Sequence, residues 1–383
     1  MSDTPFVLAG VPAGNPVLYH RIQFLVGDSA VYIGLPGGDS VLFVRDIEMD
    51  RARKIARADR IVCASDFPPE GGLSGDRDTA IAQATGEFLR CEGIKHVKTD
   101  RSLPFIYAHH IYQAGVTIEY DLELGVRQRR MKEDYEIEYL RECQAFTGTV
   151  MRAACERVAD ATVSADGSLS HAGKPLTSEG MRRWITALCL EHGYSTPHDS
   201  IVVTIPHVAV CHRRGEGPLR TSAPVIIDIF PRNDETRYWG DCTRTVVHGD
   251  MPEEVVKMHT AVCEAKTTGV AALKPGVTGE AVHADVVKVL LDRGFRFKRG
   301  SSDPNLATPA MRHGTGHGIG LDVHEPILLD EGADTILERE TFTVEPGLYS
   351  TVHGGVRVED MVLATPSGGE ILGGLYEGLD WRS

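Results

Sequence analysis

The sequence predicts two domains that mix helix and sheet: an α/β domain over residues 1–125 and an α+β domain over residues 126–383, built from two similar halves. The chain has 383 residues, enough for two or three domains at roughly 150 residues each. A basic stretch followed by a long helical pattern marks the boundary, and a pattern of helix then strands recurs in the second part.

Composition and charge narrow the possible partners. The chain is 42% hydrophobic and 25% charged, which is ordinary for a globular protein. Its net charge of -14 repels phosphate backbones and anionic lipids, so we expect neither a nucleic-acid nor a membrane partner. The eight cysteines form no CxxC pair, and the first residues lack a signal-peptide pattern. These features predict reduced thiols and a cytoplasmic protein.

The elements of the first domain follow from short apolar runs. Residues 31–35 and 40–44 flank the turn sequence Pro-Gly-Gly-Asp and predict two paired strands. Residues 60–64 form a further strand candidate, and residues 78–91 have the apolar spacing of a helix. None of these segments carries a chemical motif, so we assign no catalysis to this domain.

The second domain begins with the basic stretch 127–132, which reads Arg-Gln-Arg-Arg-Met-Lys. We interpret these charges as a solvated entrance to the long amphipathic helix that continues to about Val158. The alternative is a patch that binds a partner.

A weak internal repeat organises the rest of the chain. Two segments, 174–194 and 274–295, each place Pro and Thr before a helical pattern, Glu in its first turn and Gly at its end. A histidine and two acids follow each segment: His212, Asp228 and Asp241 in the first half, and His313, Glu345 and Glu359 in the second. Duplicated halves of helix and sheet would make the two acid pairs face each other.

The four acids lie on or beside apolar strands, where an uncompensated charge costs several kcal/mol. Each carboxylate must be protonated, paired with arginine or bound to a metal ion. Four such carboxylates, two in each half of the repeat, favour a metal site over the other two explanations. The glycine-rich segment 313–325 contains three histidines, one of which would supply a fifth ligand. Two divalent cations would balance the four carboxylates. Oxygen and nitrogen ligands without thiolate suit Mn, Co, Fe or Zn, and two such ions can hold a bridging hydroxide.

The motifs WGDCTRT, HGTGHGIGLDVHE, TVEPGLY and GVRVED, with their order of Asp, Asp, His, Glu and Glu, closely resemble those of the pita-bread metallopeptidases. This family includes Xaa-Pro aminopeptidases, prolidases and methionine aminopeptidases. The resemblance covers residues 130–383 and implies the pita-bread fold with its pseudo-two-fold repeat. Residues 1–125 resemble the smaller creatinase/prolidase-type N-terminal domain.

The resemblance also implies a role for each site residue. One metal ion would be held by Asp228 and Asp241, and the other by Asp241, His317, Glu345 and Glu359, with Asp241 and Glu359 bridging. Manganese is the ion that the family favours.

The catalytic roles are likewise implied by the resemblance. Glu345 would accept a proton, and His324 would contact the substrate peptide. His212 would line the pocket near the free amino group, and Arg357 would act behind the metal ligands. His313 would support the pocket.

Three segments differ from the family pattern beside the expected pocket: 204–212, 228–232 and the residues after Glu325. Prolidases often carry an arginine after the His-Glu pair, where this chain has Pro-Ile-Leu-Leu, which favours an aminopeptidase. We therefore predict a homodimeric exopeptidase that acts on peptides with a free N-terminus, ahead of proline. The alternatives are an Xaa-Pro dipeptidase (prolidase), an inactive pita-bread protein that binds a peptide or partner, and a creatinase-like C–N hydrolase.

Overall fold

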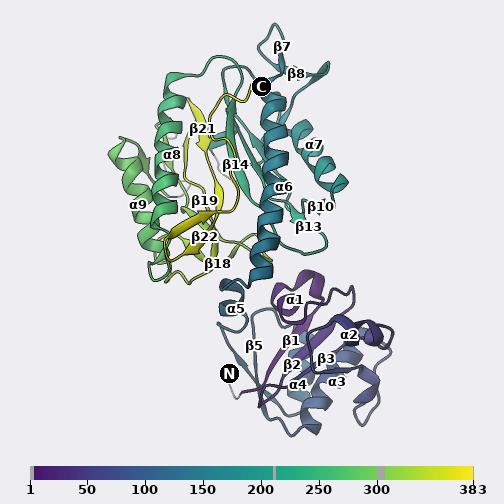
Figure 1. Cartoon of the computed structure of the whole chain (residues 1–383). Coiled ribbons are helices and arrows are strands. Elements are labelled where there is room, and N and C mark those ends of the chain that lie inside the picture. The colour runs from purple at the N-terminus through teal and green to yellow at the C-terminus, as the bar shows by residue number, and fades with distance from the viewer. Residues whose placement is uncertain (1–3, 210–212, 300–306, 383) are drawn as a thin grey trace. The chain divides into compact units, whose positions relative to one another are not determined.

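The computed structural model describes residues 4–209, 213–299 and 307–382. The chain separates into two compact units, Met1–Arg129 and Arg130–Ser383, drawn in purple to blue and in blue to yellow (Figure 1). Within the described residues, every helix is too short or too polar to cross a lipid bilayer.

A six-stranded sheet with the order β4-β3-β2-β1-β5-β6 forms the centre of the N-terminal unit. Its strands are β1 (Phe6–Gly10), β2 (Ala30–Gly34), β3 (Ser40–Phe43), β4 (Arg60–Val62), β5 (His96–Thr99) and β6 (Thr117–Tyr120). The expected hairpin is confirmed, because β2 and β3 pair antiparallel with Val31 opposite Phe43. The helices are α1 (Pro16–Ile22), α2 (Met49–Ile55), α3 (Arg77–Cys91) and α4 (Phe105–Gln113).

Helices cover both faces of this sheet because strand side chains alternate in direction. On β1, Val7 packs in one core with Phe88 of α3. Its neighbour Leu8 packs in a second core with Leu18 and Ile22 of α1. The helix expected at residues 78–91 is therefore confirmed as α3, with its apolar side on the sheet.

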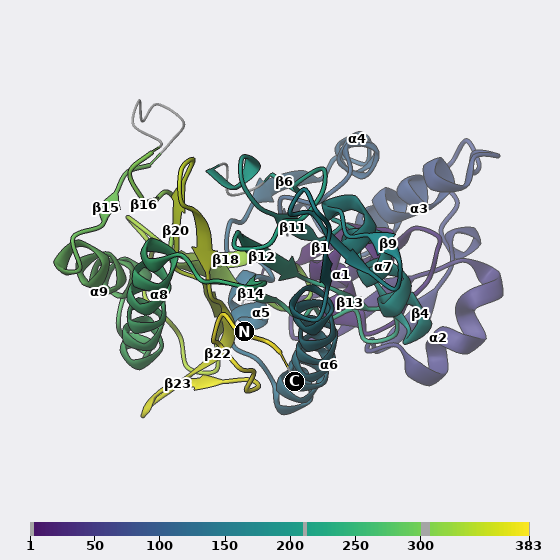
Figure 2. The same ribbon diagram turned by 90° about the horizontal axis from the view of Figure 1, so that it is seen from above.

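The C-terminal unit has two halves, as the sequence repeat predicts. The first half has α6 (Asp134–Ala159), α7 (Ser178–Glu191) and the sheet β11-β12-β14. The second half has α8 (Glu253–Ala272), α9 (Gly279–Asp292) and the sheets β15-β16-β20-β21 and β18-β17-β19-β22-β23. Figure 2 shows the strands between the two helix pairs.

The strands of the first half are β7 (Thr162–Val163), β8 (Leu169–His171), β9 (Lys174–Pro175), β10 (Tyr194–Ser195), β11 (Ile201–Val203), β12 (Pro224–Ile229), β13 (Arg232–Asn233) and β14 (Cys242–Val247). Those of the second half are β15 (Arg296–Phe297), β16 (Ala310–Met311), β17 (Gly316–Gly318), β18 (Glu325–Leu329), β19 (Thr341–Val344), β20 (Gly347–Ser350), β21 (Gly354–Arg357), β22 (Asp360–Thr365) and β23 (Gly368–Ile371).

Equivalent capping supports the repeat. Thr177 accepts a hydrogen bond from the backbone N–H of Gly180 at the start of α7, and Thr278 does the same for Ala281 in α9. The halves meet where the N–H of Glu359 donates to the carbonyl of Thr243, at 3.1 Å. Strands from both halves therefore lie side by side at the point where the predicted acids occur.

The interpretation of the basic stretch as a solvated helix entrance is wrong for three of its four charges, because Arg129, Arg130 and Lys132 are buried. Arg130, at the end of α5 (Val126–Arg130), forms a buried ion pair with Glu340 at 2.5 Å. Lys132 forms another with Glu325 at 2.6 Å, and both of those side chains are 2% exposed. These partners lie about 200 residues away in the sequence, so local charge patterning could not reveal them.

Candidate metal centre

All five predicted metal ligands line one cavity of about 510 Å³ in the C-terminal unit. Asp228 lies in β12, and Asp241 directly precedes β14. His317 lies in β17, Glu345 follows β19, and Glu359 lies between β21 and β22. The short, mostly buried strands of both halves thus deliver polar side chains to a shared interior space.

Three of these residues form the tightest cluster. Asp241, His317 and Glu359 each offer a ligand atom within 4.8 Å of the other two. The Nε2 atom of His317 lies 3.8 Å from Asp241 Oδ2 and 3.6 Å from Glu345 Oε1. Its Nδ1 lies 3.1 Å from the carbonyl oxygen of Gly318, which can only accept a hydrogen bond. Nδ1 therefore carries the proton, and Nε2 presents its lone pair to the carboxylates.

The electrostatics of the cluster oppose ionisation in the metal-free chain. Burial, followed by the charge of Asp228, raises the pKa of Glu345 to about 7. Burial and neighbouring carboxylates also raise the pKa values of Asp241 and Glu359 well above the usual range. Burial, followed by the nearby His324, lowers the pKa of His317 to about 3, which keeps its imidazole neutral.

This donor set fits divalent cations. The four predicted carboxylates meet Arg357, whose single charge can offset only one of them. Carboxylate oxygen and neutral imidazole nitrogen are ligands that Mn, Fe, Co and Zn accept. The thiol of Cys242, next to Asp241 in sequence, is directed to the carbonyl of Glu359 at 3.7 Å. Cations would therefore relieve the repulsion that raises the carboxyl pKa values.

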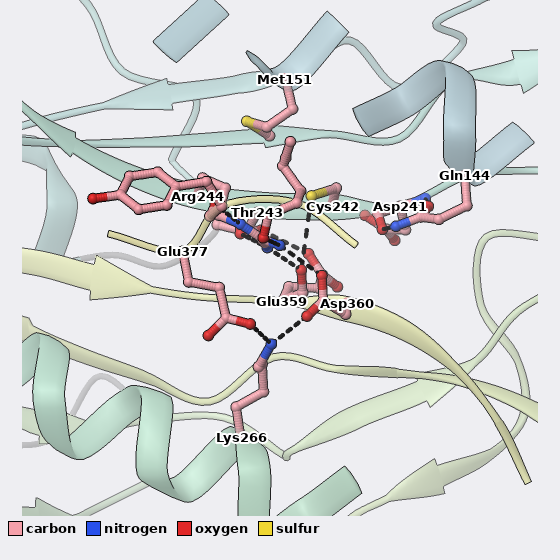
Figure 3. A network of polar contacts seen from close by, with 12 residues as sticks. Gln144, Met151, Asp241, Cys242, Thr243, Arg244, Lys266, Glu359, Asp360 and Glu377 are labelled. Atoms are coloured by element: carbon pink, nitrogen blue, oxygen red, sulfur yellow. Dashed lines mark hydrogen bonds and ion pairs between the residues drawn. The ribbon is translucent and has the colours of Figure 1, made fainter. Parts of the chain in front are cut away.

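Gln144 of α6 fixes the backbone of Asp241. Its side-chain oxygen accepts from the Asp241 N–H at 3.0 Å, and its amide donates to the Asp241 carbonyl at 2.9 Å. Figure 3 shows this amide beside Asp241. Sequence reasoning missed Gln144, because it lies 97 residues from Asp241 within an ordinary amphipathic helix pattern.

A buried network of ions fixes the backbone beside Glu359 (Figure 3). Arg244, which is fully buried, donates to the carbonyl of Glu359 at 2.5 Å and to Asp360 Oδ1 at 2.7 Å. Lys266 of α8 contacts the other oxygen of Asp360 and also Glu377 at 2.5 Å. The two positive and two negative charges compensate one another. Their contacts fix the backbone of Glu359 and Asp360.

Arg357 connects Asp228 to the cavity wall. Its guanidinium donates to Asp228 Oδ2 at 2.6 Å and to the hydroxyl of Tyr349 at 2.9 Å. The same hydroxyl lies 2.7 Å from Nε2 of His313, which lines the cavity as expected. Thr243 donates to Glu359 Oε2 at 2.6 Å. The predicted Arg357 therefore lies behind Asp228, and Tyr349 is a further member that sequence reasoning missed.

The remaining wall of the cavity combines apolar side chains, such as Val323 and Leu328, with polar ones, among them Asp330. His324 lines the cavity, and the centroid of its ring lies 4.3 Å from the centroid of the His317 ring. Phe230, from a segment that departs from the family pattern, also lines it. Sequence reasoning did not single out two further lining residues, His198 and Arg214. The predicted pocket residue His212 lies outside the described residues.

Comparison with known proteins adds independent findings. Residues 138–366 match the model of metallopeptidase family M24. The Xaa-Pro dipeptidase of Pyrococcus horikoshii is 27% identical over 378 residues, which cover 94% of this chain and 91% of that protein.

Solved structures agree with this match. The Xaa-Pro dipeptidase from Bacillus anthracis superposes with a TM-score of 0.78 at 22% identity, covering 98% of this chain and 94% of the other. The X-Pro aminopeptidase from Thermotoga maritima gives a TM-score of 0.77 at 19% identity, covering 98% and 96%. The fold is therefore the pita-bread fold, as the sequence resemblance implied.

Proposed function

The chain belongs to metallopeptidase family M24 and is a peptide hydrolase, and we propose that it removes the N-terminal residue of peptides whose second residue is proline. The chemistry is assigned to residues 126–383 and none to residues 1–125. The observation that carries the proposal is the single cavity that contains four carboxylates and the lone pair of His317.

Asp228, Asp241, His317, Glu345 and Glu359 are proposed to hold two divalent ions. When bound, these ions would polarise the scissile carbonyl and activate a water molecule. Manganese is the proposed ion. The proposal is supported by the cluster of Asp241, His317 and Glu359 and by the raised carboxyl pKa values around it.

The chain's own residues are proposed to handle the proton and the substrate. Glu345, whose Oε1 lies 3.4 Å from the Thr343 hydroxyl, would accept the proton of the attacking water. His324 would donate a hydrogen bond to the peptide oxygen as negative charge develops there. Arg357 would hold the Asp228 carboxylate in place through their 2.6 Å ion pair. His212 remains a predicted pocket residue.

The preferred length of the substrate has two candidates. After Glu325, the chain continues into an apolar strand whose Leu328 lines the cavity, which favours longer peptides over dipeptides. The full-length likeness to a protein named Xaa-Pro dipeptidase favours a dipeptide. In that case Arg214, which lines the cavity and lies 3.4 Å from Asp199, is the candidate partner of the free carboxylate.

Peptide hydrolysis tests the proposal. Manganese-loaded protein is incubated with Ala-Pro, Ala-Pro-Ala and Ala-Ala-Ala, and the products are identified and quantified with and without EDTA. The product Pro-Ala from Ala-Pro-Ala reports removal of the first residue, and the product Ala-Pro reports removal of the last. We expect release of the first alanine from the proline peptides, and its loss in EDTA. Release from the C-terminus, or equal rates on Ala-Ala-Ala, would contradict the proposal. The ratio of Ala-Pro to Ala-Pro-Ala turnover decides between the two lengths.

We also propose a cytoplasmic homodimer. The free thiols of the described cysteines, five of which are buried, are consistent with a reducing compartment. Light scattering during gel filtration tests the dimer, and a mass of one chain would contradict it.

A further inference from the structure

The loop that carries His324 is closed by a buried carboxylate. Glu325 Oε1 accepts from the backbone N–H groups of Leu321 and Asp322 at 3.0 and 3.4 Å. Its other oxygen, Oε2, pairs with the ammonium of Lys132 at 2.6 Å. One side chain therefore joins the start of the loop to its end, immediately next to His324.

Lys132 is itself held from both sides. Its backbone N–H donates to the carbonyl of Arg339 at 3.2 Å, and the Arg339 guanidinium donates back to the Lys132 carbonyl at 2.6 Å. Lys132 and Glu325 are each only 2% exposed, so water cannot screen either charge. Removing one of them would take this ion pair away from the other buried charge, which is strongly unfavourable.

The ion pair packs directly against the backbone of the loop. A Cβ atom at Gly320 would lie 2.6 Å from Lys132 Nζ and 2.8 Å from both carboxylate oxygens of Glu325. Trp239 holds the same backbone through hydrogen bonds from its N–H to Gly320 O and from its indole to Leu321 O, both at 3.1 Å. The shape of the loop therefore depends on the pair and not only on the neighbouring strands.

We propose that Lys132 is a positioning residue for His324: by fixing Glu325, it holds the loop 320–325 so that the His324 imidazole stays at the cavity wall beside His317. Lys132 touches no reacting atom and acts by holding Glu325 and the loop beside it. The inference rests on the proposed role of His324 in catalysis.

Arg130 provides a matched control. Arg130 is also a buried cation at the start of the C-terminal unit, and its guanidinium pairs with Glu340 at 2.5 Å. In the described part of the chain, neither member of this pair lines the cavity. Arg130→Met therefore breaks a comparable ion pair without touching the loop that carries His324.

Steady-state kinetics compares Lys132→Met with Arg130→Met in manganese-loaded protein. We expect Lys132→Met to lower kcat about 30-fold or more while KM changes less than about threefold and the metal content is unchanged. Arg130→Met is expected to lower the thermal midpoint but to keep kcat within about threefold of wild type. Equal losses of kcat in the two variants would overturn the inference. If Lys132→Met does not fold, Lys132→Gln, which keeps a donor without the charge, replaces it with the same criteria.

An NMR measurement separates this inference from the proposed function. The His324 ring signal of zinc-loaded, 13C-histidine-labelled protein, assigned with His324→Ala, should shift in Lys132→Met and stay in place in Arg130→Met. This holds whether or not the protein cleaves the proline peptides. An unshifted His324 signal in Lys132→Met would overturn the inference alone, whereas a shifted signal without peptidase activity would overturn only the proposed function.

Discussion

Replacing Gln144 by Met tests how the fold holds Asp241. The substitution keeps the size and flexibility of the side chain but removes both hydrogen bonds to the Asp241 backbone. Each buried backbone group left without a partner costs about 1–3 kcal/mol, so the free energy of unfolding should fall by about 2–6 kcal/mol. Loss of a group that orients a ligand typically weakens metal binding by about 10–100-fold, and we expect the same here.

The assay for Gln144→Met combines thermal melts with a manganese titration against a competing chelator. The control is the same substitution at an exposed glutamine, Gln128→Met, which should leave both quantities unchanged. If Gln144→Met binds manganese as tightly as wild type and melts at the same temperature, the assigned positioning role of Gln144 is refuted.

Three further predictions concern rate, pH and packing. His324→Ala should lose about 100-fold or more in kcat and retain its metal by elemental analysis; loss of metal would show that His317 is not the ligand. In EDTA, unfolding releases a proton from Glu345 between about pH 4.5 and 7, because its pKa is raised from 4.5 to about 7 only in the folded chain. Glu345 alone should therefore lower the stability of the metal-free protein by about 3 kcal/mol as pH rises through this window, and the raised pKa values of Asp241 and Glu359 add to this loss. Denaturant titrations that show no loss would contradict the buried site. Gly316→Ala should destabilise the protein, because the added Cβ atom would clash with the carbonyl oxygen of Thr343. The control is Gly148→Ala in α6, whose Cβ atom would meet nothing within 4 Å. In the same denaturant titrations this control should stabilise the protein by up to about 1 kcal/mol.

Local sequence signals were sufficient for much of the fold. The turn at residues 36–39 predicted the β2–β3 hairpin because its residues favour a reversal between apolar runs. Thr177 and Thr278 predicted the starts of α7 and α9 because each hydroxyl caps the first helical turn.

The parts that could not be predicted depend on partners far away in the sequence. Lys132 looked solvated, because its partner Glu325 lies 193 residues further along the chain. Gln144 carries no signal of its own in a helix whose pattern only predicts burial. The acids were recognised because a charge on an apolar strand demands compensation, whatever its partner.

Metal content shows whether the two halves of the fold bring four carboxylates and one imidazole to a single centre. Protein loaded with manganese and freed of excess ion should contain two ions per chain by elemental analysis. Asp241→Asn, which weakens the proposed bridge between them, should contain fewer than one and release no alanine from Ala-Pro-Ala. A wild-type chain that hydrolyses this peptide at full rate without metal, or an Asp241→Asn variant that retains both ions, would show that the five residues do not form such a centre.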